Sequence, residues 1–236
     1  MKLTVSPKWV LTILLAGTVL LVIAGITGSY LKYTFDSRQI NNVVRLFDLD
    51  GEANIPSWFS SLILLLSSLL LFVIAISQRN SPRDFLAWSI LSAVFLFLSV
   101  DEAAMIHEML INTIKRVFNL SGIFYNAWVI PYGLAAIAGA VLYLPFLRRL
   151  PGSVVTFFVI GGIIFISGAV VIEMFEGRYE ATHGTSNLMY DLYVAVEEFL
   201  EMTGISIFIY ALLRYLSVSS HSLTILVQER KDPYAG

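Results

Sequence analysis

The stretch Phe85–Glu102, FLAWSILSAVFLFLSVDE, has sixteen residues without a charge, followed at once by two adjacent acids. An uncharged apolar run of this kind is typical of a helix that crosses a bilayer, which needs roughly 20 mostly apolar residues. The whole chain has the same character, because 57% of its 236 residues are hydrophobic and 14% are charged. Soluble domains are about 45–50% apolar and about 25% charged. The composition therefore indicates a polytopic membrane protein.

Six apolar stretches predict an all-α fold, a bundle of six transmembrane helices in a single domain over residues 1–236. The predicted spans cover about residues 9–31, 58–77, 85–107, 127–147, 153–175 and 196–217. Residues 32–56 are a predicted extracytoplasmic loop, and residues 218–236 a cytoplasmic tail. Within the loop, apolar residues at helical spacing predict an interfacial helix: Ile40, Val43, Val44 and Phe47. The small residues of the fourth span predict close helix packing: Ala135, Ala136, Ala138, Gly139 and Ala140.

Several classes of protein are excluded by composition. The chain has no cysteine, so it forms no disulfide framework, iron–sulfur cluster or thiolate nucleophile. Its formal net charge is −2 and no basic run is present, so we expect no nucleic-acid partner. The expected partners are the lipid bilayer and, in addition, another membrane protein or a second copy of the chain.

Lysines and arginines predict the orientation. With a cytoplasmic N-terminus, nine of them fall on the inner side and six on the outer side. Because cytoplasmic loops carry the excess of these residues, both termini are predicted to be cytoplasmic. The expected location is a bacterial inner (plasma) membrane. In this topology 14 of the 17 acidic residues lie on the outer side or at outer span ends. Acids contribute little to orientation, so their crowding needs another explanation.

The acids gather at the outer ends of the third, fifth and sixth predicted helices. Helical spacing places Glu173, Glu176, Glu180 and His183 on one stripe if the fifth helix continues past Gly177. Gly184 is then a suitable end for that helix. The candidate metal ligands are Asp101, Glu102, His107, Glu108, Glu173, Glu176, Glu180, His183, Glu198 and Glu201. Glu197, one turn before Glu201, lies beside this set.

A divalent metal is the expected cofactor, because carboxylates with one or two histidines are hard, oxygen-rich ligands. The pattern does not distinguish iron, manganese and calcium. Carboxylate di-iron bundles use two Glu-x-x-His pairs, and this chain has one, Glu180 with His183. A single metal held by three helices and a two-metal site with water ligands both fit the pattern.

Three functions remain open on this pattern. The first is a metal-dependent enzyme that acts on a membrane-soluble substrate, with the metal polarising a carbonyl or phosphoryl group or activating water. The second is an accessory or scaffold subunit of a membrane complex. The third is a cation- or proton-coupled transporter, although such carriers usually have internal repeats and broken helices, which this sequence does not show. The residue pattern names no catalytic side chain.

The topology can be tested with single cysteines, because the native chain has none. A membrane-impermeant thiol reagent added from outside should label cysteines at positions 36, 119 and 186, and should leave those at 81 and 150 unlabelled. Labelling at position 81 from outside would reverse the topology and place the acids in the cytoplasm.

Overall fold

The computed structural model describes residues 5–35, 38–107, 109, 114 and 121–219. All regular structure within these residues is helical. In chain order the elements are α1 (Pro7–Thr34), α2 (Arg38–Val44), α3 (Ile55–Ser77), α4 (Pro82–Ala104), η1 (Gly122–Phe124), α6 (Val129–Leu147), α7 (Gly152–Ile166), η2 (Ser167–Ile172), α8 (Glu173–His183) and α9 (Leu188–Val218).

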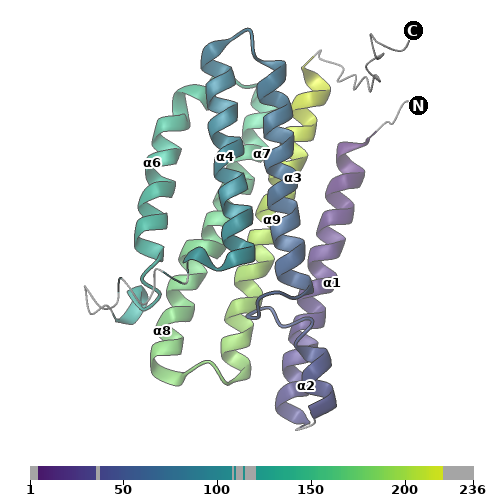
Figure 1. Ribbon diagram of the computed structural model, residues 1–236, viewed down its shortest axis with the longest axis vertical. Coiled ribbons are helices and arrows are strands. Elements are labelled where there is room, and N and C mark those ends of the chain that lie inside the picture. Colours follow the sequence, from purple (N-terminus) through teal and green to yellow (C-terminus); the bar gives the residue numbers. More distant parts are fainter. Residues whose placement is uncertain (1–4, 36–37, 108, 110–113, 115–120, 220–236) are drawn as a thin grey trace, which may run out of the picture.

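Six helices of the described chain are long and apolar enough to cross a membrane, with α7, η2 and α8 forming one continuous helix from Gly152 to His183. The protein is a helical membrane bundle. Figure 1 shows the start of α1 and the end of α9 at one end of this bundle, and α2 and the α8–α9 turn at the other. We call the first the terminal end and the second the acidic end.

Two elements follow local signals in the sequence. The fifth long helix continues past Gly177 and ends at His183, where Gly184 takes a φ of +72° that favours glycine.

α2 lies within the region between the first two long helices, and it packs against α1. Val44 is buried there beside Gly28 of α1, whereas Val43 is exposed. Part of the short helix therefore faces protein.

α9 is the central helix, since it packs against α1, α3, α7, η2 and α8. Near the terminal end, Trp88 of α4 is fully buried and contacts rings from three other helices. Its ring centroid lies 4.9 Å from Phe146 of α6, 5.9 Å from Phe158 of α7 and 4.9 Å from Tyr215 of α9. This aromatic cluster joins α4, α6, α7 and α9 at one level of the bundle.

The α3–α4 pair is held by paired serines in addition to apolar packing. The Ser68 hydroxyl donates to the Ser92 carbonyl at 2.8 Å, and the Ser92 hydroxyl donates back to the Ser68 carbonyl at 2.9 Å. Ser61 and Ser99 repeat this exchange nearer the acidic end, at 2.9 Å in both directions. Small hydroxyl residues let two helices approach closely and satisfy their own polar groups inside the apolar bundle.

α6 corrects one expectation, because its small residues do not mediate close helix packing. Its backbone approaches the bundle mainly at η2. Side chains bridge it to α4 instead, with the Tyr143 hydroxyl donating to the Ala87 carbonyl at 3.0 Å and the Tyr132 hydroxyl donating to Asp101 at 3.1 Å. Space is therefore left beside α6, and Ala135, Ala136, Gly139 and Ala140 line it.

α7 and α9 cross at glycines. A Cβ atom added to Gly161 would lie 2.8 Å from the carbonyl oxygen of Gly204, and one added to Gly204 would lie 2.5 Å from the amide nitrogen of Phe165. Neither approach is compatible with an ordinary Cβ contact. The two backbones can meet this closely only with glycine at both positions.

This crossing gives a matched pair of variants. Gly161→Ala should lower the apparent melting temperature in detergent by the equivalent of about 1–3 kcal/mol, the usual cost of overpacking. Gly162→Ala is the control, since its added Cβ would meet nothing within 4 Å. It should be neutral or slightly stabilising, because alanine is the better helix former. A Gly161→Ala protein as stable as the control would mean that α7 and α9 do not cross at this point.

Candidate metal centre

The centre begins at an irregular turn in the fifth long helix. η2 is a π-helical segment, and Glu173 is the first residue after it. Such π-turns occur mostly as short insertions and often lie at functional sites. At this turn a Cβ atom on Gly168 would lie 2.8 Å from the carbonyl oxygen of Glu197 and 2.9 Å from Cγ of Glu201. η2 and α9 are thus close enough for acids at the start of α8 to meet acids of α9.

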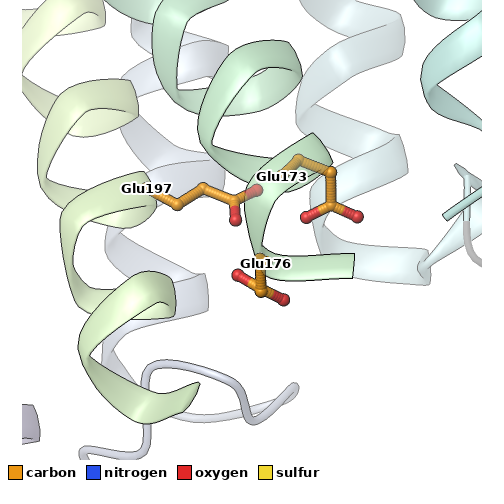
Figure 2. Close-up of side chains that lie close together, drawn as sticks. All are labelled: Glu173, Glu176 and Glu197. Atoms are coloured by element: carbon orange, nitrogen blue, oxygen red, sulfur yellow. The ribbon is translucent and has the colours of Figure 1, made fainter. Parts of the chain in front are cut away.

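Three glutamates meet there, and we call them the carboxylate cluster: Glu173, Glu176 and Glu197. One carboxylate oxygen from each lies within 4.8 Å of the other two. Figure 2 shows Glu197 extending from α9 toward α8, which carries Glu173 and Glu176 one turn apart. Glu173 is 7% exposed and Glu176 is 5% exposed. A metal ion could take one oxygen from each side chain without moving either helix.

Glu173 is oriented by a residue of the segment before α6. The indole Nε1 of Trp128 donates a hydrogen bond to Oε1 of Glu173 at 3.0 Å, and Trp128 is itself 7% exposed. The same segment is held against α8 at Gly177, where an added Cβ would lie 3.0 Å from Nδ2 of Asn126. The tryptophan therefore holds one carboxylate of the cluster in a fixed direction.

Glu176 carries a buried oxygen, Oε2, that has no hydrogen-bond partner among the described residues. A buried polar atom without a partner costs free energy, and the cost is larger for a charged group. The described residues that line the surrounding cavity include no lysine or arginine. No lysine or arginine of the described lining therefore offsets the charge of the three clustered carboxylates.

Asp101 forms a second polar centre at the end of α4. Met105 adopts a φ of +52° there, and the chain turns so that Asp101 Oδ1 accepts a hydrogen bond from the His107 backbone amide at 2.7 Å. Nδ1 of His107 lies 3.3 Å from the same oxygen. The His107 ring is 4.9 Å from the Trp128 ring, and Tyr132 bonds to the other oxygen of Asp101. These contacts link Asp101 to the tryptophan that orients Glu173.

Both centres open into one cavity of about 1260 Å³ between α4, α6, α7, η2, α8 and α9. Its polar end is lined by the carboxylate cluster, Asp101 and His107, and by six further acids: Asp50, Glu52, Glu102, Glu180, Glu198 and Glu201. The polar end thus holds many acids and has room for water or a ligand. We call this space the bundle cavity.

The structure brings most of the predicted ligands to this cavity, but not all. Asp101, Glu102, His107, Glu173, Glu176, Glu180, Glu198 and Glu201 line it. His183 does not: it is exposed, stacks on Tyr179 with ring centroids 4.4 Å apart, and lies 2.7 Å from the Thr182 hydroxyl. His183 lies outside the cavity lining because it is ten residues beyond Glu173 on α8, and this part of α8 extends past the cavity. Glu108 lies outside the described residues.

Sequence reasoning missed two residues of the centre. Glu197, and not Glu198, completes the group of three oxygens. Both lie one turn from Glu201, at four and three residues, so helical spacing favours neither. Trp128 was noticeable only as an aromatic residue at the end of a span. Trp128 reaches Glu173 because Asn126 contacts α8 at Gly177, and sequence spacing does not predict that contact.

Comparison with known proteins gives the chain a family and no activity. No curated protein and no solved structure matches it at a significant level. A family model described as a domain of unknown function, DUF8692, matches residues 9–216, which include all six long helices except short ends. The chain therefore belongs to the DUF8692 family.

Proposed function

We propose that this protein is a metal-dependent membrane enzyme, with Glu173, Glu176 and Glu197 as the ligands of a divalent cation. The observation that carries the proposal is the group of three carboxylates, in which the buried Oε2 of Glu176 has no hydrogen-bond partner among the described residues. In an apolar bundle, acids usually mark a functional pathway or site and face a partner or a wet cavity. A bound cation is the partner that these three oxygens fit.

The ligand set favours iron, manganese or calcium over softer metals. Three glutamates offer only oxygen, which suits hard cations, and His107 is a further nitrogen donor on the same cavity. Glu201 lies one turn from Glu197 and adds a carboxylate on the same helix. Facing helices that present inward carboxylates are a known way to hold one or two metals in a helical bundle.

The arrangement fits a catalytic metal site better than it fits a closed, structural metal site. The carboxylate cluster lines a cavity with room for a substrate, so a metal held by these residues would remain accessible to water or a substrate oxygen. Such a metal would polarise a carbonyl or phosphoryl group or activate a bound water. Glu198 and Glu102, on the same cavity, are suited to accept or return a proton beside it. Trp128 acts as a positioning residue for Glu173.

Elemental analysis of detergent-purified protein is the direct test. We expect a divalent metal in stoichiometric amount in the wild type. A chelator should lower the melting temperature at neutral pH, since a ligand at a hundredfold excess over Kd stabilises the fold by about 2.7 kcal/mol. The chelator effect should fade as the pH falls below neutral, because the carboxylates take up protons and protonated carboxylates no longer bind metal.

Substitutions distinguish a metal ligand from a residue that does not bind the metal. Glu176→Gln should remove the metal and the chelator effect, and Glu198→Gln should reduce both, with the fold retained because the shape is nearly kept. Asp84→Asn is the control, because Asp84 binds Arg149 at the opposite end of α4, at 2.8 Å, and should leave metal content unchanged. Wild-type protein that carries no metal and ignores the chelator would favour a scaffold role. Metal-free protein that takes up protons in liposomes would favour a carrier.

The role of Trp128 has its own prediction. Trp128→Phe keeps most of the ring packing but loses the hydrogen bond to Glu173, so the Kd for metal should rise about 10–100-fold, as for other outer-shell partners. Trp58→Phe is the matched control, since Trp58 is 69% exposed. Metal titration of the two stripped proteins measures both. Equal affinities would show that Trp128 does not orient a ligand.

A further inference from the structure

The bundle cavity extends well beyond the carboxylates. From Tyr132 to Leu147, both of which line it, α6 rises by about 22 Å, at 1.5 Å per residue. A volume of about 1260 Å³ is larger than that of an ordinary small-molecule site, which is about 300–1,000 Å³. This length is about three-quarters of the thickness of a bilayer's hydrocarbon core, which is about 30 Å. The occupant that fits is long and narrow.

The lining changes in character along this length. One end holds the acids, Tyr132 and Asn126, whereas the other end is lined by apolar and aromatic side chains such as Leu91, Leu147 and Phe158. The aromatic cluster around Trp88 lies at this apolar end. The cavity is therefore amphipathic, with one polar end and a long apolar remainder.

Small residues create the apolar space. A Cβ atom added to Gly139 of α6 or to Gly162 of α7 would meet nothing within 4 Å, and both glycines line the cavity. The α6 backbone approaches the bundle mainly at η2, and longer side chains bridge it to α4, so the cavity lies beside a helix at the outside of the bundle. An occupant that enters from the bilayer would pass beside α6.

The charge of the polar end restricts the head of the molecule. Many acids surround it, and no lysine or arginine is present among the described lining residues. A phosphate head would face like charges with at most the metal as counterion. A head with hydroxyl or carbonyl oxygens meets no such repulsion and has Tyr132, Asn126 and His107 nearby as polar groups. The hydrocarbon chain of the ligand gains little free energy on moving from lipid into the cavity, because lipid tails are as apolar as the lining. The head group therefore determines the selectivity.

We propose that the bundle cavity binds a membrane-resident amphiphile with a long hydrocarbon chain and an uncharged, oxygen-bearing head, and that this amphiphile is the substrate. The head lies at the carboxylate cluster and the chain lies beside Gly139 and Gly162. The substrate role rests on the metal site proposed above, whereas the binding of the chain rests on the cavity alone.

Photolabelling in nanodiscs tests the assignment. The probes are a long-chain fatty alcohol with a diazirine in its chain and a phosphatidic acid with the same diazirine chain. The alcohol should label peptides of α6 and α7 that line the cavity, and unlabelled alcohol should compete. Phosphatidic acid should label them several-fold less. Equal or stronger cavity labelling by phosphatidic acid would overturn the uncharged head.

Two glycines on the lining give blocking variants. Gly139→Trp and, as a second variant, Gly162→Trp should each reduce alcohol labelling at least about tenfold, because the indole would fill the open space. Gly152→Trp is the matched control: its position is equally free of neighbours but lies outside the cavity lining, so labelling should stay at the wild-type level. Melting temperature identifies any variant that has lost its fold. Unchanged labelling in both folded blocking variants would overturn the proposal.

The metal content of each sample separates the two proposals. Cavity labelling by the alcohol in protein that never holds metal would keep the amphiphile site and refute the metal enzyme. Metal bound stoichiometrically without alcohol labelling of α6 and α7 would keep the metal site and refute the amphiphile. Gly139→Trp should retain the wild-type metal content, since Gly139 lies on α6 and away from the carboxylate cluster.

Discussion

Gly168 of η2 lies so near α9 that a Cβ atom on it would approach the carbonyl oxygen of Glu197 to 2.8 Å. Together with the crossing of Gly161 and Gly204, this contact fixes the continuous helix α7–η2–α8 against α9. The acids of α8 and α9 are brought together by that backbone contact. Bulkier residues at these glycines would separate the helices, and the three carboxylate oxygens within 4.8 Å would no longer form a group. The π-turn ends at the same point, directly before the buried Glu173.

This arrangement has an electrostatic cost that the bundle must offset. An acid at the centre of a membrane helix costs roughly 2.5–3.5 kcal/mol on insertion scales, and clustered acids add mutual repulsion. Trp128 supplies one hydrogen bond to Glu173, and Glu176 retains a buried oxygen without a partner among the described residues. A cation would offset both the burial and the repulsion. Functional groups kept at such a cost are expected where a site, and not only a fold, depends on them.

The fold could be predicted from the sequence because its signals are local. Apolar length gives the long helices, and Gly184 gives the end of α8. The acids at three helix ends also predicted a shared polar region. The choice among them was not local: Glu197 joins the group because η2 packs against α9 at Gly168, and His183 is excluded because α8 carries it past the cavity. The paired serines of α3 and α4 likewise depend on the register between two helices.

α6 shows how one composition can serve two structures. Its alanines and glycine could have brought a second helix close, as small residues often do in membranes. Here Tyr143, Tyr132 and the contact of Phe146 with Trp88 hold α6 to α4 through long side chains, so the small residues face open space. The long side chains at both ends act as spacers, and the small ones between them leave the cavity. The same helix therefore keeps the bundle together and leaves beside the carboxylates a volume that a bilayer-dissolved molecule can fill.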